Sequence, residues 1–174
     1  YRQSIFKNEL KGQYAVTHAI FRLSLTPQPK LEYGALEHEV ARLGGPALAN
    51  IRSAVRTIRE SKLPDPAVLG NAGSFFMNPV IPAAQFERLK SEFPDIVSFP
   101  ADNGMVKVSA GWLIDRAGWK GRSIGPAAVY EKQALVLVNR GGATGSDIIR
   151  LADAIIKDIE EKFGITLKTE VNYI

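Results

Sequence analysis

A single serine, Ser74, lies between a glycine-rich turn and two phenylalanines in the stretch GNAGSFFMNP, residues 70–79. Without an adjacent histidine or lysine to act as a base, its hydroxyl is a poor nucleophile. The same hydroxyl can donate a proton to a more basic group, such as a carbanion or an enolate. The aromatic pair would limit water, and the glycines would let a ligand approach the backbone. The alternative is a serine that only satisfies the turn.

Three further side chains could bind or react, although each also has a plain structural explanation. Glu170 belongs to the alternating segment ITLKTEVNYI, where a solvated strand residue is equally at home. Lys62 precedes the rigid Leu63-Pro64-Asp65-Pro66, which would hold its ammonium group in place. Tyr33 in LEYG is either an exposed aromatic or a side chain that stacks on a ligand.

The glycine-rich GGATG, residues 141–145, precedes a predicted helix and so is either a phosphate cradle or a plain helix entry. It lacks the lysine of a P-loop, and no dinucleotide-binding fingerprint, zinc-protease motif or acyl-transfer triad is recognisable. Two histidines are too few for a convincing metal site, so we predict no metal.

Hydrophobic periodicity predicts an α+β fold in which strands and helices alternate irregularly. The predicted strands are 14–25, 105–109, a strand-turn-strand over 127–139, and 165–174. The predicted helices are about 46–60, 83–93, 109–117 and 146–163, the last with Gly164 at its left-handed C-cap. Residues 61–73, with two prolines and two glycines, are predicted to be a linker or a domain crossing.

Composition narrows the class of protein without selecting a function. The 174 residues carry a net charge of +4 with scattered lysines and arginines, which suits anionic small molecules as well as nucleic acid. No basic helix with interleaved aromatics stands out, so nucleic-acid binding is disfavoured. No apolar run could cross a membrane and no signal peptide is visible. The absence of cysteine fits a reducing compartment, and we expect a cytoplasmic protein. We also expect a monomer. The start at Tyr1 suggests the later part of a longer protein.

The strings NAGSFFMNP, SKLPDP, AGWLIDRAGWKG, GPAAVYEKQALVLVNRGGATGSDI and TEVNYI, with YRQSIFK at the start, resemble the UDP-N-acetylenolpyruvoylglucosamine reductases, or UDP-N-acetylmuramate dehydrogenases. The resemblance covers nearly the whole chain. It implies an enzyme of peptidoglycan precursor synthesis in which NADPH reduces bound FAD. The flavin then passes hydride to the enolpyruvyl ether of UDP-N-acetylglucosamine enolpyruvate, which gives UDP-N-acetylmuramate.

The resemblance also implies roles for individual residues. The serine of GSFF, Ser74, would protonate the carbon that has accepted electron density. Arg2 would hold the substrate carboxylate, and Glu170 would pair with Arg2 and support the intermediate. Met77 stands where relatives often have lysine. The positions expected to contact the uridine diphosphate are Tyr33, Lys62, Asn78, Lys120 and Gln133, of which Lys62 and Tyr33 are also candidates to touch the nicotinamide cofactor.

The flavin-binding lobe of that family precedes the YRxS segment and is missing here. The resemblance therefore implies three parts: residues 1–63 as the tail of the FAD-binding region, 64–164 as the substrate-binding domain, and 165–174 as a strand returning to the FAD-binding region. Alone, this fragment is expected to be inactive. Two other hypotheses stay open: a nucleotide-sugar-binding module without redox chemistry, and a structural domain with no ligand.

Overall fold

The computed structural model describes residues 4–173. In chain order its elements are η1 (Ile5–Lys7), α1 (Leu36–Arg42), α2 (Leu48–Lys62), β1 (Asn71–Ser74), β2 (Val80–Pro82), α3 (Ala83–Glu92), β3 (Ser98–Pro100), β4 (Met105–Val108), α4 (Ala110–Arg116), β5 (Ser123–Ile124), β6 (Ala127–Val129), β7 (Val136–Asn139) and α5 (Gly145–Phe163). Helices accompany antiparallel strands, which confirms the predicted α+β class.

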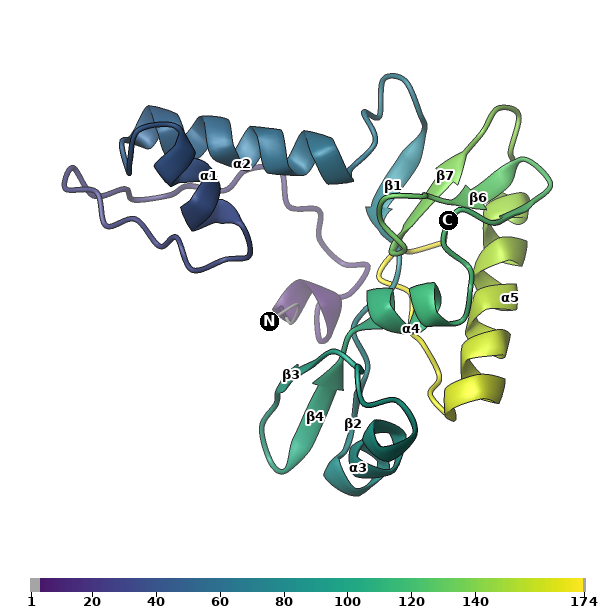
Figure 1. The fold of residues 1–174 in the computed structure, drawn as a ribbon. Helices are drawn as coiled ribbons and strands as arrows, with labels where there is room; N and C mark the ends of the chain where they lie inside the picture. Colours follow the sequence, from purple (N-terminus) through teal and green to yellow (C-terminus); the bar gives the residue numbers. More distant parts are fainter. Residues whose placement is uncertain (1–3, 174) are drawn as a thin grey trace.

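The strands form two antiparallel sheets. The larger has the order β1-β7-β6-β5, and the smaller has the order β2-β4-β3. Helix α5 packs along the larger sheet and α3 covers the smaller one. Helix α4 lies between the two sheets (Figure 1). Residues 75–79 connect the two sheets, so the stretch that follows Ser74 runs from one to the other.

Helix α5 shows how the sequence fixes one long element. Thr144 and Asp147 form a capping box, in which each side chain bonds to the other's backbone. Gly164 ends the helix with φ of 61°, as predicted for a left-handed C-cap. Leu151, Ala152, Ile155, Ile159 and Phe163 make up the buried face. The predicted helix 146–163 is therefore confirmed, starting one residue earlier.

The main core joins both sheets and α5 through apolar side chains. Phe75 and Phe76 are 2% and 0% exposed, and their ring centres lie 5.3 Å apart. At the other end of α5, Phe163 packs edge-on against Phe93 at 5.2 Å. Burial of each such ring stabilises the fold by about 1.5–3 kcal/mol.

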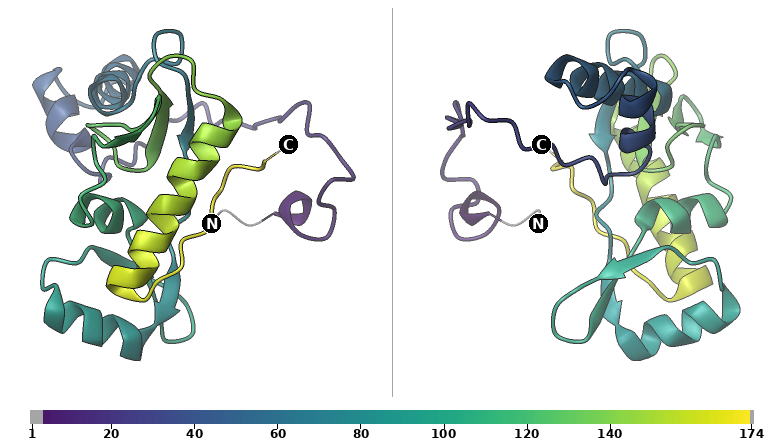
Figure 2. Two further views of the ribbon diagram at one scale, coloured as in Figure 1. Left: turned by 90° about the vertical axis from the view of Figure 1, so that its right-hand side faces the viewer. Right: turned by 60° about the vertical axis from the view of Figure 1, so that its left-hand side comes forward.

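The N-terminal region packs differently. Helices α1 and α2 share a small separate cluster built on Leu36, Val40 and Ala54. The segment before them extends away from the main core (Figure 2). The predicted strand 14–25 is wrong for this structure, since these residues form neither helix nor strand. A strand needs a partner for its backbone groups, and no described residue provides one.

Several smaller predictions also need correction. The predicted strand 165–174 makes a single isolated bridge, between Thr169 and Phe76, within its described residues. Strand β1 begins inside the predicted linker 61–73. Strands β2 and β3 were not predicted, because they contain Pro82 and Pro100 and proline argues against a strand. Both are edge strands beside the central β4, where proline is tolerated. Over the described residues, no helix combines the length and apolar character that crossing a membrane requires.

Candidate active site

Ser74 is the last residue of β1, opposite Val136 of β7. The strand register shifts between Asn71 and Ser74, and Gly73 takes a φ of 72°, which favours glycine. The Asn71 side chain accepts a 3.0 Å hydrogen bond from the Gly73 amide and so braces this turn. Ser74 is half-buried, and its hydroxyl forms no hydrogen bond with any residue that the structure describes.

The two phenylalanines after Ser74, which the sequence analysis expected to limit water, are both buried in the main core. Phe75 also packs against Tyr173, with ring centres 6.3 Å apart. Burial raises the pKa of the Tyr173 hydroxyl above its ordinary value, although a hydrogen bond with Thr169 opposes the shift. The aromatic pair therefore anchors the backbone that carries Ser74.

Glu170 lies beside this backbone despite its distance in the sequence. Its amide donates a 2.8 Å hydrogen bond to the Phe75 carbonyl, and the Met77 amide donates a 2.9 Å bond to the Lys168 carbonyl. The C-terminal segment thus runs along residues 75–77. Ser74 and Glu170, predicted from separate parts of the sequence, belong to adjoining backbone segments.

A cation faces the Glu170 carboxylate. The Lys7 ammonium of η1 lies 3.5 Å from Glu170 Oε1, and the Glu170 side chain is 25% exposed. A hollow of about 240 Å³ opens here, lined by Phe6, Lys7, Asn8, Lys11, Met77, Thr169, Glu170 and Asn172. Arg2, the cation expected from the sequence, lies outside the described residues. Lys7 was missed, although its place in YRQSIFK, near Arg2, was a signal.

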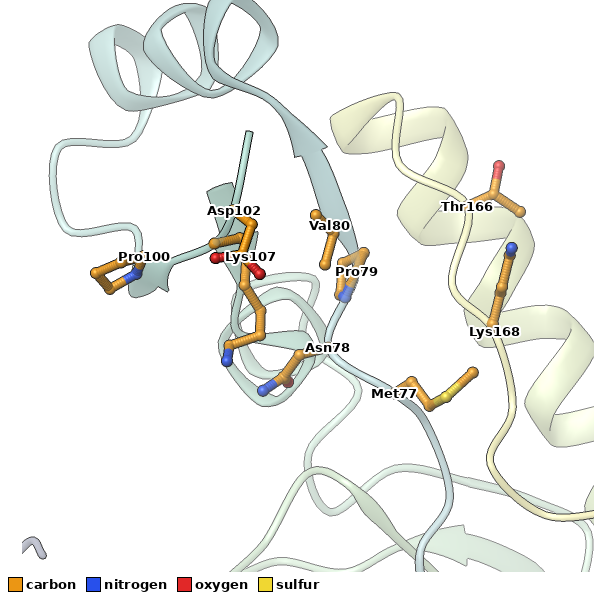
Figure 3. Close-up of a pocket in the computed structure, with 10 residues that line it drawn as sticks. Met77, Asn78, Pro79, Val80, Pro100, Asp102, Lys107, Thr166 and Lys168 are labelled. Carbon is orange, nitrogen blue, oxygen red and sulfur yellow. The ribbon is translucent and has the colours of Figure 1, made fainter. Parts of the chain in front are cut away.

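A larger hollow of about 580 Å³ lies beside Asn78, against the smaller sheet (Figure 3). Asn78 Oδ1 accepts a 3.0 Å hydrogen bond from the Ala110 amide at the start of α4, which leaves the side-chain NH₂ to donate. Lys107 of β4 ends on the same side as Asn78, while Lys168, on the C-terminal segment, extends toward Thr166 (Figure 3). This hollow offers an anion two ammonium groups and one amide donor, while the Asp102 carboxylate on the same lining opposes an anion.

Sequence reasoning missed Lys107 and Lys168 as site residues. Lys107 lies in one row with Val80 and Phe99 across the small sheet, and its ammonium lies 5.6 Å from the centre of the Phe99 ring. The alternation of MVKV could have indicated that Lys107 points to the opposite face of the strand from Val106 and Val108.

Gln133 and Lys120 lie near opposite ends of α4. Gln133 Oε1 accepts a 3.4 Å bond from the Leu135 amide, and a Cβ added to Gly111 would come within 3.8 Å of that oxygen. A Cβ there would make only ordinary van der Waals contacts, so the start of α4 lies beside the turn between β6 and β7 without requiring glycine. Lys120 follows α4 and pairs with Asp115 at 3.0 Å.

The other two predicted substrate contacts belong to the N-terminal region. Tyr33 precedes α1 with 88% of its surface exposed, and Lys62 is the exposed last residue of α2. Neither lines the hollows beside Asn78 or Glu170. The structure thus sets the Glu170 backbone beside Phe75, the residue after Ser74, although Ser74 lines neither of these two hollows. Gln133 lies beside the start of α4, and Tyr33 and Lys62 are not brought to either place.

The GGATG loop fits the plain helix entry rather than the phosphate cradle. The Thr144 amide and hydroxyl both donate to Asp147 Oδ2, at 2.9 and 2.7 Å. These bonds, the one from the side chain foremost, lower the pKa of the Asp147 carboxyl. A carboxylate at the start of α5 would repel a phosphate placed there.

A family model for the UDP-N-acetylenolpyruvoylglucosamine reductase C-terminal domain matches residues 65–174. The reductase of that name from Bacteroides fragilis is 50% identical over the whole chain, which covers 52% of its length. The one from Burkholderia lata is 53% identical over 98% of the chain, which covers 50% of its length. The chain thus spans about half the length of the curated relatives it matches.

Among solved structures, the crystal structure of UDP-N-acetylenolpyruvylglucosamine reductase from Thermus caldophilus aligns with a TM-score of 0.43 at 23% identity. That alignment covers 72% of this chain and 33% of the other. The family model spans most of this chain, and the matched relatives are identical at half or more of the aligned positions. The chain therefore belongs to the UDP-N-acetylenolpyruvoylglucosamine reductase family.

Proposed function

We propose that this chain is the substrate-binding part of an enzyme that reduces UDP-N-acetylglucosamine enolpyruvate to UDP-N-acetylmuramate for peptidoglycan synthesis. Support comes from relatives named as this reductase that match along the whole chain. The observation that carries the proposal is the 2.8 Å hydrogen bond from the Glu170 amide to the Phe75 carbonyl, which sets a carboxylate-bearing residue next to the Ser74 backbone.

The reaction needs a proton donor at a defined carbon. Hydride addition to the β-carbon of the enolpyruvyl ether leaves an electron pair on the α-carbon, delocalised onto the carboxylate. The Ser74 O–H then donates its proton to the α-carbon, a C–H bond forms, and the serine oxygen regains a proton from solvent. A serine hydroxyl can act as this acid because the enolate is more basic than the alkoxide it leaves. No hydrogen bond to a described residue competes for the Ser74 hydroxyl.

Charge grows on the substrate carboxylate as the hydride arrives, so fixed cations nearby lower the barrier. We assign this role to Arg2, as the resemblance implies, with Glu170 holding that cation and supporting the intermediate. Lys7, 3.5 Å from Glu170 Oε1, adds a second positive charge beside the Glu170 carboxylate. Because 52% of the Lys7 side chain is exposed, its contribution is the smaller.

The uridine diphosphate binds along the face from Asn78 to Lys120 in this proposal. Asn78 donates an amide proton, and Lys107 and Lys168 provide point charges at the hollow they line. Gln133 and Lys120 extend the contacts along α4. Tyr33 and Lys62 reach the same ligand from the N-terminal region, which requires that region to close on the domain in the whole protein.

The expected cofactors are FAD and NADPH, with the reduced flavin supplying hydride when bound. The described residues do not fit a flavin. The glycine-rich turn before α5, where a dinucleotide phosphate would be expected, is closed by the Asp147 carboxylate. We assign the flavin to the half of the relatives' length that this chain does not cover, and every role proposed here belongs to the chain's own residues.

The proposed domain division is the one that the resemblance implies, and the separate cluster of α1 and α2 supports its first boundary. Residues 1–63 belong with the flavin-binding region, 64–164 form the substrate domain, and 165–174 return toward the flavin-binding region. The exposed apolar residues of 14–25, such as Phe21 and Leu25, support a partner outside this chain. For this substrate we propose action in the cytoplasm, as a monomer.

The test uses the whole protein with Ser74→Ala, Ser74→Cys and, as the matched control, Ser123→Ala, a change at an exposed serine of β5. Stopped-flow absorbance separates flavin reduction by NADPH from flavin reoxidation by the enolpyruvyl substrate. We expect Ser74→Ala to leave the first step intact and to slow the second by about 10²–10⁴-fold. Ser74→Cys retains more activity than Ser74→Ala, and Ser123→Ala behaves as wild type.

Two outcomes would contradict the assignment. Normal reoxidation in Ser74→Ala removes Ser74 from proton donation. A whole protein that binds UDP sugars yet never passes hydride to the enolpyruvyl substrate would instead be a nucleotide-sugar-binding module.

A further inference from the structure

Lys120 occupies a short surface turn between α4 and β5, residues 117–122, which we name the Lys120 turn. A lysine on a mobile turn pays an entropic cost whenever a ligand orders it. Gly121 in this turn has a φ of 79° and donates through its amide to the Val129 carbonyl at 3.1 Å. The backbone thus closes the turn onto β6, but it does not attach the turn to α5.

Two side chains of α5 make that attachment. The indole Nε1 of Trp119 donates a 2.7 Å hydrogen bond to Asp158 Oδ2. Lys162 Nζ donates to the same carboxylate oxygen at 2.9 Å and also to the Ala117 carbonyl at 3.1 Å. The start and the middle of the Lys120 turn are therefore both fixed to one point on α5.

Trp119 makes this anchor rigid. Its side chain is 7% exposed, so its N–H would lose a hydrogen bond if Asp158 were absent. The guanidinium of Arg122 lies 4.6 Å from the centre of the indole ring and covers its outer face. Burial tends to raise the pKa of Asp158, but the bonds from Lys162 and Trp119 outweigh it and the carboxyl stays below its ordinary pKa.

The bonds to Asp158 and Lys162 do not involve the Lys120 side chain, which can make other contacts. Its ammonium lies 3.0 Å from Asp115 Oδ2 on α4, with 36% of its side chain exposed. Asp115 therefore contacts the Lys120 ammonium directly, whereas Asp158 holds the backbone of the turn through Trp119.

We propose that Asp158 is a positioning residue that, through Trp119, holds Lys120 in place for the diphosphate of the substrate. This inference rests on the proposed function, and it concerns residues that the family resemblance did not single out. Asp158 itself touches no ligand in this proposal. Its effect on binding passes through Lys120 and disappears when the Lys120 ammonium is removed.

The experiment is a double-mutant cycle in the whole protein, with UDP as the binding probe in calorimetry and the enolpyruvyl substrate for kinetics. The variants are Lys120→Met, Asp158→Ala, Trp119→Phe, Asp158→Asn and the double variant Lys120→Met/Asp158→Ala. Glu161→Ala is the matched control, because Glu161 lies on the same helix and, among the described residues, pairs only with Lys157 at 3.8 Å.

We expect Lys120→Met to weaken UDP binding about tenfold and Asp158→Ala or Trp119→Phe about threefold to fivefold, in line with the loss of one charged contact and of its alignment. The loss falls on KM more than on kcat. The double variant binds UDP as Lys120→Met does. Asp158→Asn keeps an acceptor for the indole and so retains most of the affinity, and Glu161→Ala matches wild type.

Equal weakening by Asp158→Ala with and without the Lys120 ammonium would overturn the proposal, because the effect would then be a general loss of structure. Unchanged UDP affinity in Lys120→Met would overturn it too, while substrate turnover by that variant would leave the proposed function standing. If the wild-type protein neither bound UDP nor reduced the substrate, the proposed function would fail first. Trp119→Phe keeps an aromatic side chain but removes the indole N–H. It therefore tests the same contact if Asp158→Ala does not fold.

Discussion

The two ends of this chain bury their apolar residues to very different degrees. In the C-terminal region, Leu113 and Ile155 are fully buried in one core. In residues 14–25, Ile20 and Leu25 are essentially as exposed as in an unfolded chain, at 100% and 102%. Apolar side chains of this size normally leave water on folding. One region therefore holds its own core, whereas residues 14–25 leave their large apolar side chains in water.

The candidate site lies on the border between the two regions. Glu170 is held by the C-terminal core through Phe75, but it meets Lys7 from the N-terminal region. Tyr33 and Lys62 belong wholly to the N-terminal region. The C-terminal region alone thus positions Ser74, Asn78 and Lys120. The placement of Lys7, Tyr33 and Lys62 depends on how the N-terminal region is held.

Hydrogen exchange gives the largest expected contrast. Backbone amides of residues 14–25 form no hydrogen bond with any described residue, whereas those of β7 lie between β1 and β6. We expect β7 amides to exchange at least about a thousandfold more slowly than those of 14–25, because they open only with much of the core. Mass spectrometry of peptides from this chain measures the ratio.

The same measurement on the whole protein sharpens the comparison. There the amides of 14–25 gain protection while those of β7 change little. Slow exchange of 14–25 in the isolated chain would instead show that the segment already has a partner within it.

Paired truncations test the comparison by stability. Leu113→Ala empties part of a closed core and is expected to cost about 2–5 kcal/mol of unfolding free energy. Ile20→Ala in the same chain changes it by less than about 0.5 kcal/mol, because the side chain is already in water. Urea unfolding followed by the fluorescence of Trp112 and Trp119 measures both. Similar costs for the two variants would contradict the division into a cored and an uncored region.

The sequence pattern predicted best where local and tertiary preferences agree. Helix α5 has an apolar stripe, a capping pair and a terminal glycine that all favour the same limits. Strands β4, β6 and β7 fell within predicted strands for a similar reason, since they are apolar and lie inside their sheets or against the core.

Prediction of strands from the sequence failed where pairing with another strand, and not the local sequence, decides whether a strand forms. The alternation in 14–25 resembles a strand, but a strand exists only with a partner, and none is present among the described residues. Strands β2 and β3 have prolines and few residues, so their existence depends on β4. That the Glu170 segment runs along the residues after Ser74 could not be predicted from any local pattern, because local sequence does not show which distant segments lie side by side.

The capping box of α5 gives the smallest expected effect and tests the cored region at its edge. Thr144→Ala removes the acceptor for the Asp147 amide and is expected to cost about 1 kcal/mol of unfolding free energy. Asp147→Asn tests the charge. The pKa of Asp147 is lowered in the folded chain, so its carboxylate stabilises the fold above the pKa it has when unfolded, and this stabilisation is lost as pH falls through the lower, folded value.

Urea unfolding at a series of pH values therefore distinguishes charge from hydrogen bonding at this cap. Wild type is expected to be more stable than Asp147→Asn at pH 7, and the gap narrows below about pH 4, where an unfolded aspartate takes up its proton. A gap that stayed constant to the lowest pH would show that the carboxylate charge plays no part. The start of α5 would then be stabilised by Thr144 alone, and the argument that Asp147 keeps a phosphate away from this turn would lose its electrostatic basis.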